Sequence, residues 1–331
     1  MPTTVIETPA TPYMQVPGTS GRLDWADLRT LDLVKYDLPG ENQELARPPL
    51  PNEEKQKYRA ALEQGNYNRW KPASIRNLIP GVKNNFEDYN LPKFIPEHAG
   101  RPHPEIVRAH WHSIERFSRH VHNHNVKKLL VIFAVALGLE DEEWLVKRHR
   151  YDQTSGDHLR YMKYYVRSEE NSKLGGVWRK EHSDMGSLTL FFCEPVAALQ
   201  VLTKSGVWKY VRPQMEALSV NIADALQFMT SSIHRVVAPP KDQAHIDRLG
   251  VLYMVRIEDD CDLVPIDESP VPQKHGLTGN KVLGSDGQPL KLGNGSSSGS
   301  SRTRESPQRK RVPNEVNDVE ALKGVKVHYF D

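Results

Sequence analysis

The sequence predicts a mainly β fold with flanking helices. Its second half contains short apolar segments at 198–202, 207–212, 217–221 and 226–229, separated by turn-forming residues such as Lys204-Ser205-Gly206. Short β-prone runs between such turns are typical of strands in a small barrel or sandwich. Before them, apolar residues recur every three or four positions through 103–124, which predicts an amphipathic helix that backs the barrel. The apolar run 129–139 predicts a buried helix.

The stretch 181–192, EHSDMGSLTLFF, carries the first chemical signal. Side chains two positions apart on a strand point to one face, so His182 and Asp184 are expected to converge. His234, in SSIHRVV, is the best candidate for a third ligand brought back by the fold. Two histidines and one carboxylate form the facial triad of non-haem iron(II) oxygenases, which leaves metal positions open. The HxD pattern alone is weak, and an ordinary surface or core pair is the alternative.

Arg248 supports the triad because it begins an apolar run that reads as a strand. A guanidinium entering a barrel interior needs an anion, and its planar fork suits a carboxylate. A dicarboxylate co-substrate is therefore expected. The alternatives are an arginine at the barrel rim, or one paired with Asp247 or Asp259.

Several stretches in this half resemble one family in order: LRYMKYY, HSDMGSLTLFF, AALQVLTKSGVWKYVRP, NIADALQF, SIHRVVAPP and DRLGVLYMVR. The segment 158–259 resembles the catalytic half of the isopenicillin N synthase-like 2-oxoglutarate/Fe(II) dioxygenases, notably fungal clavaminate-synthase-like members. The resemblance implies a double-stranded β-helix (jelly-roll) core. It also implies that His182, Asp184 and His234 bind iron, and that Arg248 and Tyr164 bind 2-oxoglutarate. Lys163 and Gly250 stand where the family usually has Asn and Ser.

The function that this resemblance implies is oxidation of a small organic molecule by O₂, with 2-oxoglutarate converted to succinate and CO₂. Hydroxylation, desaturation and ring chemistry all remain open, and the fungal members suggest secondary metabolism. The alternative is a degenerate, non-catalytic member. Compared with the pattern of this family, a helix and a strand are expected to be missing after Arg47, and the hairpin before His234 is expected to be short. A zinc- or other metal-binding cupin-like module would explain the triad but not Arg248.

Two groups of residues are candidates for the wall of a substrate pocket. Tyr67, Trp70 and Phe94 lie in the segment 66–98, which reads as loops. The second group consists of apolar strand residues: Leu188, Leu190, Phe192, Leu199, Val201 and Val236. Ordinary packing is the alternative for both groups.

The composition limits the other function classes. The 331 residues include 44 basic and 42 acidic side chains, so net charge gives no sign of a nucleic-acid partner. The longest apolar run is too short for a bilayer, which takes about 20 residues, and no signal peptide is visible at the N-terminus. We therefore expect no membrane partner. Cys193 and Cys261 form no disulfide framework and fit a reducing, cytoplasmic location, although one bridge stays open. The histidines of 103–124 are expected to be solvated or packed.

The chain divides into four predicted regions. Residues 1–21 are Thr- and Pro-rich and are expected to be disordered. Residues 22–150 form a helical and loop region, and 151–265 form the catalytic jelly roll. Residues 266–331 form a mostly disordered tail with a Gly/Ser-rich linker at 293–301 and a basic run at 302–313.

Overall fold

We describe the protein from a computed structural model. The structure describes residues 16–28, 51–62, 66–167, 170–192, 194–214, 217–229, 232–262, 266–274, 317–322 and 325–329. The predicted linker at 293–301 and the basic run at 302–313 lie outside these ranges.

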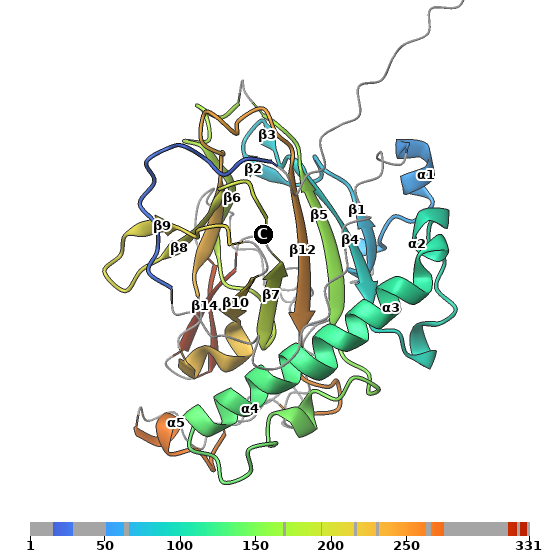
Figure 1. Ribbon diagram of the computed structural model, residues 1–331, viewed down its shortest axis with the longest axis vertical. Coiled ribbons are helices and arrows are strands. Elements are labelled where there is room, and N and C mark those ends of the chain that lie inside the picture. Colours follow the sequence, from blue (N-terminus) through green and yellow to red (C-terminus); the bar gives the residue numbers. More distant parts are fainter. Residues whose placement is uncertain are drawn as a thin grey trace, which may run out of the picture.

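Two antiparallel sheets form the body of the protein (Figure 1). The larger sheet has the order β1 (Arg69–Lys71), β4 (Phe86–Pro92), β5 (His158–Tyr164), β12 (Arg248–Val255), β7 (Leu188–Phe192) and β10 (Leu218–Ile222). The smaller sheet has the order β6 (Val177–His182), β11 (His234–Val237), β8 (Leu199–Leu202) and β9 (Trp208–Tyr210). Two separate hairpins are β2 (Asn77–Ile79) with β3 (Val82–Lys83), and β13 (Asn317–Leu322) with β14 (Val325–Tyr329). This arrangement of sheets confirms the predicted jelly-roll core.

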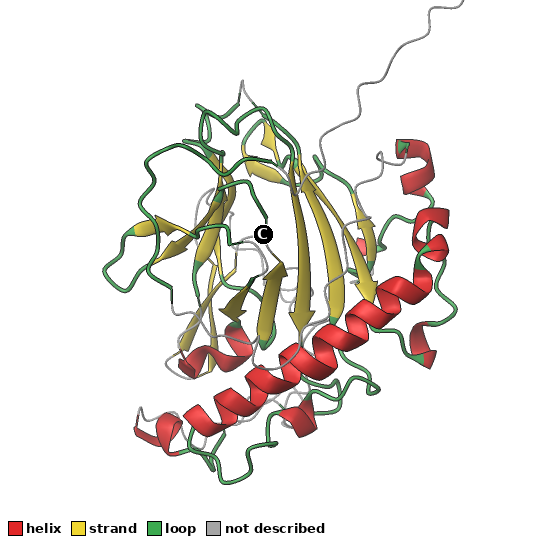
Figure 2. Cartoon of the chain, viewed as in Figure 1, coloured by secondary structure: helices red, strands yellow, loops and turns green. Residues whose placement is uncertain are grey.

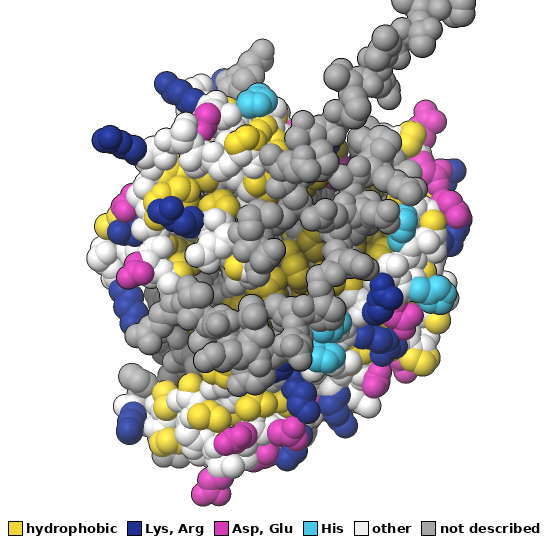
Figure 3. Space-filling view, viewed as in Figure 1, with side chains coloured by type: hydrophobic (Ala, Val, Ile, Leu, Met, Phe, Trp, Pro, Cys, Tyr) yellow, Lys and Arg dark blue, Asp and Glu magenta, His cyan; other side chains and the backbone are white. Residues whose placement is uncertain are grey.

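The two sheets pack face to face. Met162 and Tyr164 of β5 contact Trp178 of β6 and Val236 of β11 in one buried cluster. Alternate residues of a strand share a face, so the residues paired with Met162 and Tyr164 on β4 and β12 also point between the sheets. Figure 3 shows apolar side chains near the centre of this face of the molecule and charged ones toward its edge.

A helical layer covers the other face of the large sheet (Figure 2). It comprises α2 (Glu105–Ala109), α3 (Trp111–His120), the π-helical turn η5 (Val121–Val126) and α4 (Lys127–Ala136). Leu129 and Leu130 join Leu159 of β5 and Leu190 of β7 in the main core. The expectation of a fully buried helix over 129–139 is wrong, because Val135 is 52% exposed. The helix is amphipathic and buries only the side that faces the sheet.

Short helices connect or flank these layers. They are α1 (Asn52–Gln56), η4 (Pro96–His98), η6 (Val146–Arg148), η7 (Asp224–Met229) and α5 (Pro270–Lys274). The predicted strand at 226–229 is wrong, since these residues lie in η7. The Asp224 carboxylate accepts a hydrogen bond from the Gly186 N–H at 2.7 Å, and this contact holds the turn.

The segment 66–98, predicted as loops, contains β1 to β4. The prediction missed β4 because its inward side chains are polar: Asp88 and Asn90 are both buried. A strand with polar residues inside lacks the alternation by which half-buried strands are recognised. Strands β1 and β4 precede residue 150, yet they complete the same sheet as β5 and β12.

The free edge of β1 is partly covered. Trp70 donates its backbone N–H to the Tyr58 carbonyl, and Ala60 donates its own to the Trp70 carbonyl. This contact covers part of an edge that would otherwise be open to pairing with another strand. Within the described segment 16–28, Trp25 makes a single bridge to Tyr210.

Two further expectations concern the membrane and the cysteines. None of the described helices combines the length and apolarity needed to cross a bilayer. Cys261 is a free thiol. Cys193 lies outside the described residues.

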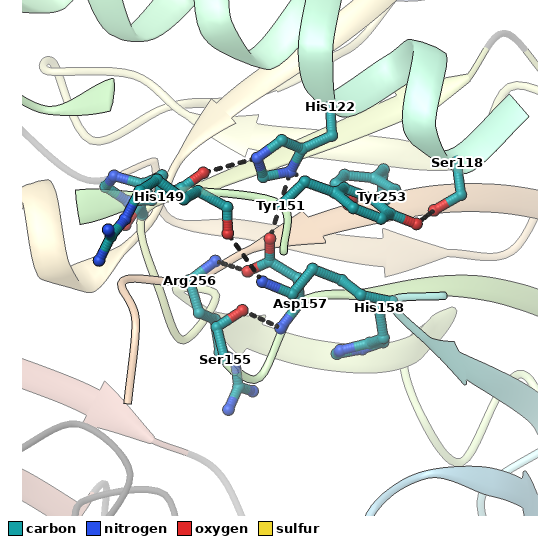
Figure 4. Close-up of polar contacts among 12 residues, drawn as sticks. Ser118, His122, His149, Tyr151, Ser155, Asp157, His158, Tyr253 and Arg256 are labelled. Carbon is teal, nitrogen blue, oxygen red and sulfur yellow. Dashed lines mark hydrogen bonds and ion pairs between the residues drawn. The ribbon is translucent and has the colours of Figure 1, made fainter. Parts of the chain in front are cut away.

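A buried polar network joins the helical layer to the large sheet (Figure 4). His122 of η5 donates its Nε2 hydrogen to the His149 carbonyl at 2.6 Å, and its Nδ1 lies 3.3 Å from Asp157. His149 donates from Nδ1 to the Leu145 carbonyl and accepts at Nε2 from the Ser187 hydroxyl, both at 2.7 Å. The histidine at position 122 is thus a structural link and not a metal ligand.

Two buried histidines, His149 of this network and His103 outside it, predict a loss of stability in mild acid. Burial lowers the pKa of His149 below its ordinary value, and burial together with nearby arginines lowers the pKa of His103 to about 4. Below pH 6.5 the unfolded chain therefore binds more protons at these sites, and stability falls with pH by up to ~1.4 kcal/mol per unit for each histidine. We expect urea unfolding to show a decrease of about 2 kcal/mol between pH 7.5 and 5.5. In His149→Gln this decrease in unfolding free energy should be smaller than in the wild-type protein, whereas the exposed control His112→Gln should match the wild type. Equal decreases in all three proteins would contradict the assignment of the pH dependence to His149.

Candidate metal centre and co-substrate anchor

Three predicted ligands meet between the two sheets. His182 ends β6 and His234 begins β11, and these two residues are paired directly across the ladder. Asp184 follows in the loop toward β7, with its carboxylate oxygens 3.7 Å from His182 Nε2 and 3.8 Å from His234 Nε2. One potential ligand atom from each residue lies within 4.8 Å of the others. In the described part of the chain, this is the only group of three such side chains that could hold a metal ion.

Backbone carbonyls set the orientation of both imidazoles. His182 Nδ1 lies 2.9 Å from the Lys180 carbonyl, and His234 Nδ1 lies 3.0 Å from the Ser232 carbonyl. Because a carbonyl only accepts, each Nδ1 carries the proton and each Nε2 keeps its lone pair. His182 Nε2 is buried and has no hydrogen-bond partner among the described residues. A cation at this point would satisfy it.

The electrostatics of the centre favour a metal-ready state. Burial lowers the pKa of His182 well below its ordinary value, and Arg179 and His234 lower it further, so the ring stays neutral. Burial opposes ionisation of Asp184, but His234, His182 and Arg179 lower its pKa below the ordinary value. Two neutral imidazoles and one carboxylate are the donor set that suits Fe(II) while leaving positions open.

The loop that carries Asp184 is held from two sides. The Asn221 side-chain amide of β10 donates to the Asp184 carboxylate at 2.7 Å, and the Asp224 N–H donates to the Asp184 carbonyl. Gly186 has φ +118°, and a Cβ there would lie 2.6 Å from the Val255 carbonyl oxygen. Only glycine fits this close approach. The sequence analysis did not identify Asn221 as a site residue, although it lay at the end of a predicted strand.

Asn221 provides a direct test of this support. We expect Asn221→Ala to weaken Fe(II) affinity about 10- to 100-fold, the usual effect of losing a partner that orients a metal ligand. Anaerobic metal titration followed by calorimetry measures this change. Asn123→Ala, on the exposed side of η5, is the matched control. Unchanged affinity in Asn221→Ala would mean that the amide does not orient the carboxylate.

Arg248 lies further along the inner face of the large sheet, buried at the start of β12. It pairs across the ladder with Tyr164 of β5, and its guanidinium lies 5.2 Å from the Tyr164 ring centroid. Arg248 Nε and Tyr164 Oη are both buried without a hydrogen-bond partner among the described residues. Two adjacent unpaired donors fit a carboxylate acceptor.

A carboxylate of the protein already contacts this arginine. Glu194 Oε2 lies 2.5 Å from Arg248 Nη2, and both side chains are at most 5% exposed. The predicted alternatives do not apply, because Asp247 pairs with Lys163 and Asp259 makes no ion pair with Arg248. Glu194 was missed because it follows a strand end and meets Arg248 only in the folded sheet. Gly250 leaves no polar side chain here; a Cβ would lie 3.3 Å from the Phe191 ring.

The space beside this ion pair is small. Arg248 and Glu194 border a cavity of about 40 Å³. Ligand pockets usually enclose roughly 300 Å³ or more. A dicarboxylate therefore needs a local rearrangement to reach Arg248, whose Nη2 contacts Glu194.

Most residues predicted to wall a pocket pack instead. Phe94, Leu188 and Leu190 belong to the main core, and Phe192 packs against it. Trp70 is buried and donates from its indole to Glu87 at 2.9 Å. Val236 faces the interior between the sheets, and Leu199 borders the small cavity beside Arg248.

Comparison with known proteins agrees with this geometry. The sequence pattern of the 2OG-Fe(II) oxygenase superfamily matches residues 156–253, a stretch that contains the triad and Arg248. This part of the chain is similar to that superfamily. The match does not distinguish the clavaminate-synthase-like group within it. The superfamily's cofactors, Fe(II) and 2-oxoglutarate, agree with the donor set at the centre.

Curated relatives match over part of their length. The 2-oxoglutarate-dependent dioxygenase frbH of Dothideomycetidae sp. is 30% identical over 47% of this chain and 49% of its own. The 2-oxoglutarate-dependent dioxygenase FG08081 of Gibberella zeae is 28% identical over 53% of each chain. Gibberellin 2-beta-dioxygenase 2 of Arabidopsis thaliana is 33% identical over 46% of this chain and 44% of its own. The chain thus spans about half the length of the curated relatives it matches.

Solved structures share the fold. A full-length Neurospora crassa protein in complex with alpha-KG superimposes with a TM-score of 0.61 at 19% identity, covering 76% of this chain and 78% of the Neurospora chain. A 2OG-Fe(II) oxygenase family protein from Caulobacter crescentus has a TM-score of 0.60 at 18% identity, over 77% and 81%. At these identities the likeness establishes the jelly-roll architecture.

Proposed function

We propose that this protein is a 2-oxoglutarate- and Fe(II)-dependent oxygenase that oxidises a small organic molecule. The observation that carries the proposal is the meeting of His182 Nε2, His234 Nε2 and the Asp184 carboxylate within 4.8 Å inside the barrel. Arg248 and Tyr164, further along the same interior, supply two unpaired donors for a co-substrate.

In this proposal His182, Asp184 and His234 hold the metal. When bound, Fe(II) and 2-oxoglutarate supply the oxidising power, and 2-oxoglutarate and O₂ are consumed as succinate and CO₂ form. The backbone carbonyls of Lys180 and Ser232 keep both Nε2 lone pairs available. Asn221 keeps the carboxylate of Asp184 in place.

Arg248 anchors the distal carboxylate of the co-substrate. Its guanidinium has five N–H donors, and Glu194 engages only one edge. Tyr164 Oη donates to the same carboxylate from the neighbouring strand. Apolar side chains around the anchor, including Met162, Trp178 and Val236, keep bulk water away from the reacting centre.

The reaction outcome and the setting are also proposals. The substrate is a small molecule, oxidised by hydroxylation, desaturation or ring chemistry. The fungal relatives frbH and FG08081 are dioxygenases by name, which supports the reaction class and a role in secondary metabolism. A cytoplasmic location fits the low cysteine content.

A second candidate is a non-catalytic member of the superfamily that keeps the barrel. The observation that favours it is the ion pair between Arg248 and Glu194, which fills the anchor with a carboxylate of the chain itself. The complete donor set at the metal centre favours the enzyme.

Anaerobic titration of the purified protein with Fe(II) and 2-oxoglutarate tests the proposal. Chelation of 2-oxoglutarate by the bound iron gives a weak visible charge-transfer band. We expect the band in the wild-type protein and its loss in Asp184→Ala. Folded protein that shows no band at saturating 2-oxoglutarate would overturn the proposal and favour the non-catalytic candidate.

A further inference from the structure

A layer of charged side chains lies on the inner face of the large sheet, beside the metal centre. It consists of Lys71 on β1, Asp88 on β4 and Arg160 on β5, which we call the inner cluster. Lys71 pairs across the ladder with Asp88, while Arg160 pairs with Asn90, two positions along β4. Arg160 lies on the face of β5 that also carries Met162 and Tyr164 and points between the sheets.

The inner cluster is close to the metal centre and far inside the protein. Arg160 interacts electrostatically with Asp184 and with Arg179. The side chains of Lys71 and Arg160 are each 11% exposed, and that of Asp88 is 5% exposed. These charges therefore lie largely out of water, where an unbalanced charge is costly.

Positive charge exceeds negative charge in the inner cluster. Lys71 Nζ lies 2.6 Å from Asp88 Oδ1, and Arg160 Nε lies 3.9 Å from the same oxygen. The hydrogen bonds of Arg160 go to neutral acceptors, Asn90 Oδ1 at 2.9 Å and His158 Nε2 at 3.1 Å. Burial lowers the pKa of Lys71 to about 7, and Arg160 lowers it further against the effect of Asp88. Arg160 is therefore charged without a carboxylate in hydrogen-bond contact among the described residues, and Lys71 adds a second positive charge only while it is protonated.

A third cation faces the same interior. Arg179 of β6 holds its guanidinium 5.7 Å from the Phe86 ring centroid and makes no ion pair with any described carboxylate. It acts electrostatically on His182 and Asp184. The metal takes up the negative charge of Asp184, so this carboxylate cannot neutralise Arg160 and Arg179 in the loaded protein.

We propose that the inner cluster binds a carboxylate group of the substrate, so the oxygenase acts on small organic acids. This inference rests on the proposed function. Asn90 accepts the hydrogen of Arg160 Nε, and His158 accepts one hydrogen of Arg160 Nη2. The edge of the guanidinium that its two terminal nitrogens form is therefore left for a carboxylate. Such an edge binds a carboxylate in a two-bond geometry, and Lys71 adds a third donor. The bound acid then presents its C–H groups to the adjacent metal centre.

Four acids, each paired with its primary amide, test the inference: benzoate, phenylacetate, 3-phenylpropanoate and hexanoate. Calorimetry on anaerobic protein with Fe(II) and saturating 2-oxoglutarate gives the dissociation constant of each probe. We expect at least one acid to bind about tenfold or more tightly than its amide, because charge-assisted hydrogen bonds replace neutral ones. Equal binding of acid and amide in all four pairs would overturn the inference.

Variants locate the preference. In Arg160→Gln the acid should lose its advantage over the amide, while Arg116→Gln, on the exposed side of α3, keeps it. Lys71→Met tests the same site with a smaller change, and its preference for the acid over the amide should fall severalfold. If Arg160→Gln does not fold, an unchanged preference for the acid in Lys71→Met counts against the inference. Persistence of the full preference in folded Arg160→Gln also counts against it.

The occupant of the inner cluster could instead be a carboxylate of 2-oxoglutarate. In that case Arg160→Gln would weaken 2-oxoglutarate binding, as measured by the charge-transfer band, as much as it weakens binding of the acid. This result would overturn the inference and leave the proposed function intact. Absence of the band in the wild-type protein would instead contradict the proposed function, and acid binding to the protein alone would still be measurable by calorimetry.

Discussion

The Asp184→Asn variant is expected to lose at least about 100-fold in Fe(II) affinity, and 2-oxoglutarate turnover with it. Loss of a residue that only hydrogen-bonds a metal ligand typically lowers metal affinity about 10- to 100-fold. The Asp184→Asn change is larger, because it removes the only anionic ligand of the three. The fold should persist, because asparagine has the same shape and can still accept from the Asn221 amide. Neutralising a buried carboxylate also removes its desolvation cost in the metal-free protein.

Metal titration and succinate formation measure the effect, and thermal unfolding of the metal-free protein measures the fold. Asp152→Asn is the matched control, because the Asp152 carboxylate is 80% exposed and belongs to no site. If Asp184→Asn kept a tenth or more of the turnover, the assignment of the carboxylate ligand would be wrong.

The Arg248→Ala variant is expected to lose both 2-oxoglutarate binding and about 3–5 kcal/mol of unfolding free energy. Its partner Glu194 would be left as a buried carboxylate without its cation, and such uncompensated charges are strongly destabilising. A double variant, Arg248→Met with Glu194→Met, removes both charges at once. We expect it to recover most of the stability, because replacing a whole buried ion pair by apolar side chains is often neutral or stabilising.

Urea unfolding and the charge-transfer titration separate the two roles of Arg248. Both variants should lack the 2-oxoglutarate band, although only the single variant is unstable. Arg150→Ala is the control for breaking an arginine–glutamate pair, and it should cost less because the Arg150 side chain is 59% exposed. A band of normal affinity in the double variant would show that Arg248 is not the anchor.

The sequence was sufficient to predict the convergence of the triad. His182 and Asp184 are local to one another, although Asp184 lies in the loop after β6 and not on the strand. His234 lies opposite His182 in the β6–β11 ladder, and its strand β11 was not among the predicted strands. Iron binding by these residues stays a prediction.

Contacts that depend on the sheet order could not be predicted from the sequence. Glu194 meets Arg248 because β7 and β12 are neighbours, which no local pattern reveals. Asp88 and Asn90 fall in a segment predicted as loops, because inward polar side chains hide a strand. A polar interior is itself a functional feature, so the sequence rules failed at the place where a site is proposed.

The order of the large sheet has a consequence for how such a protein diversifies. The triad and Arg248 lie within the residues that match the superfamily, whereas β1 and β4, which carry Lys71 and Asp88, precede them. In the proposed inner cluster, Arg160 is encoded together with the oxidising centre, whereas the side chains around it are encoded separately. Mutations or recombination within residues 66–92 can therefore alter the surroundings of Arg160 and the recognised acid while the oxidising centre stays the same.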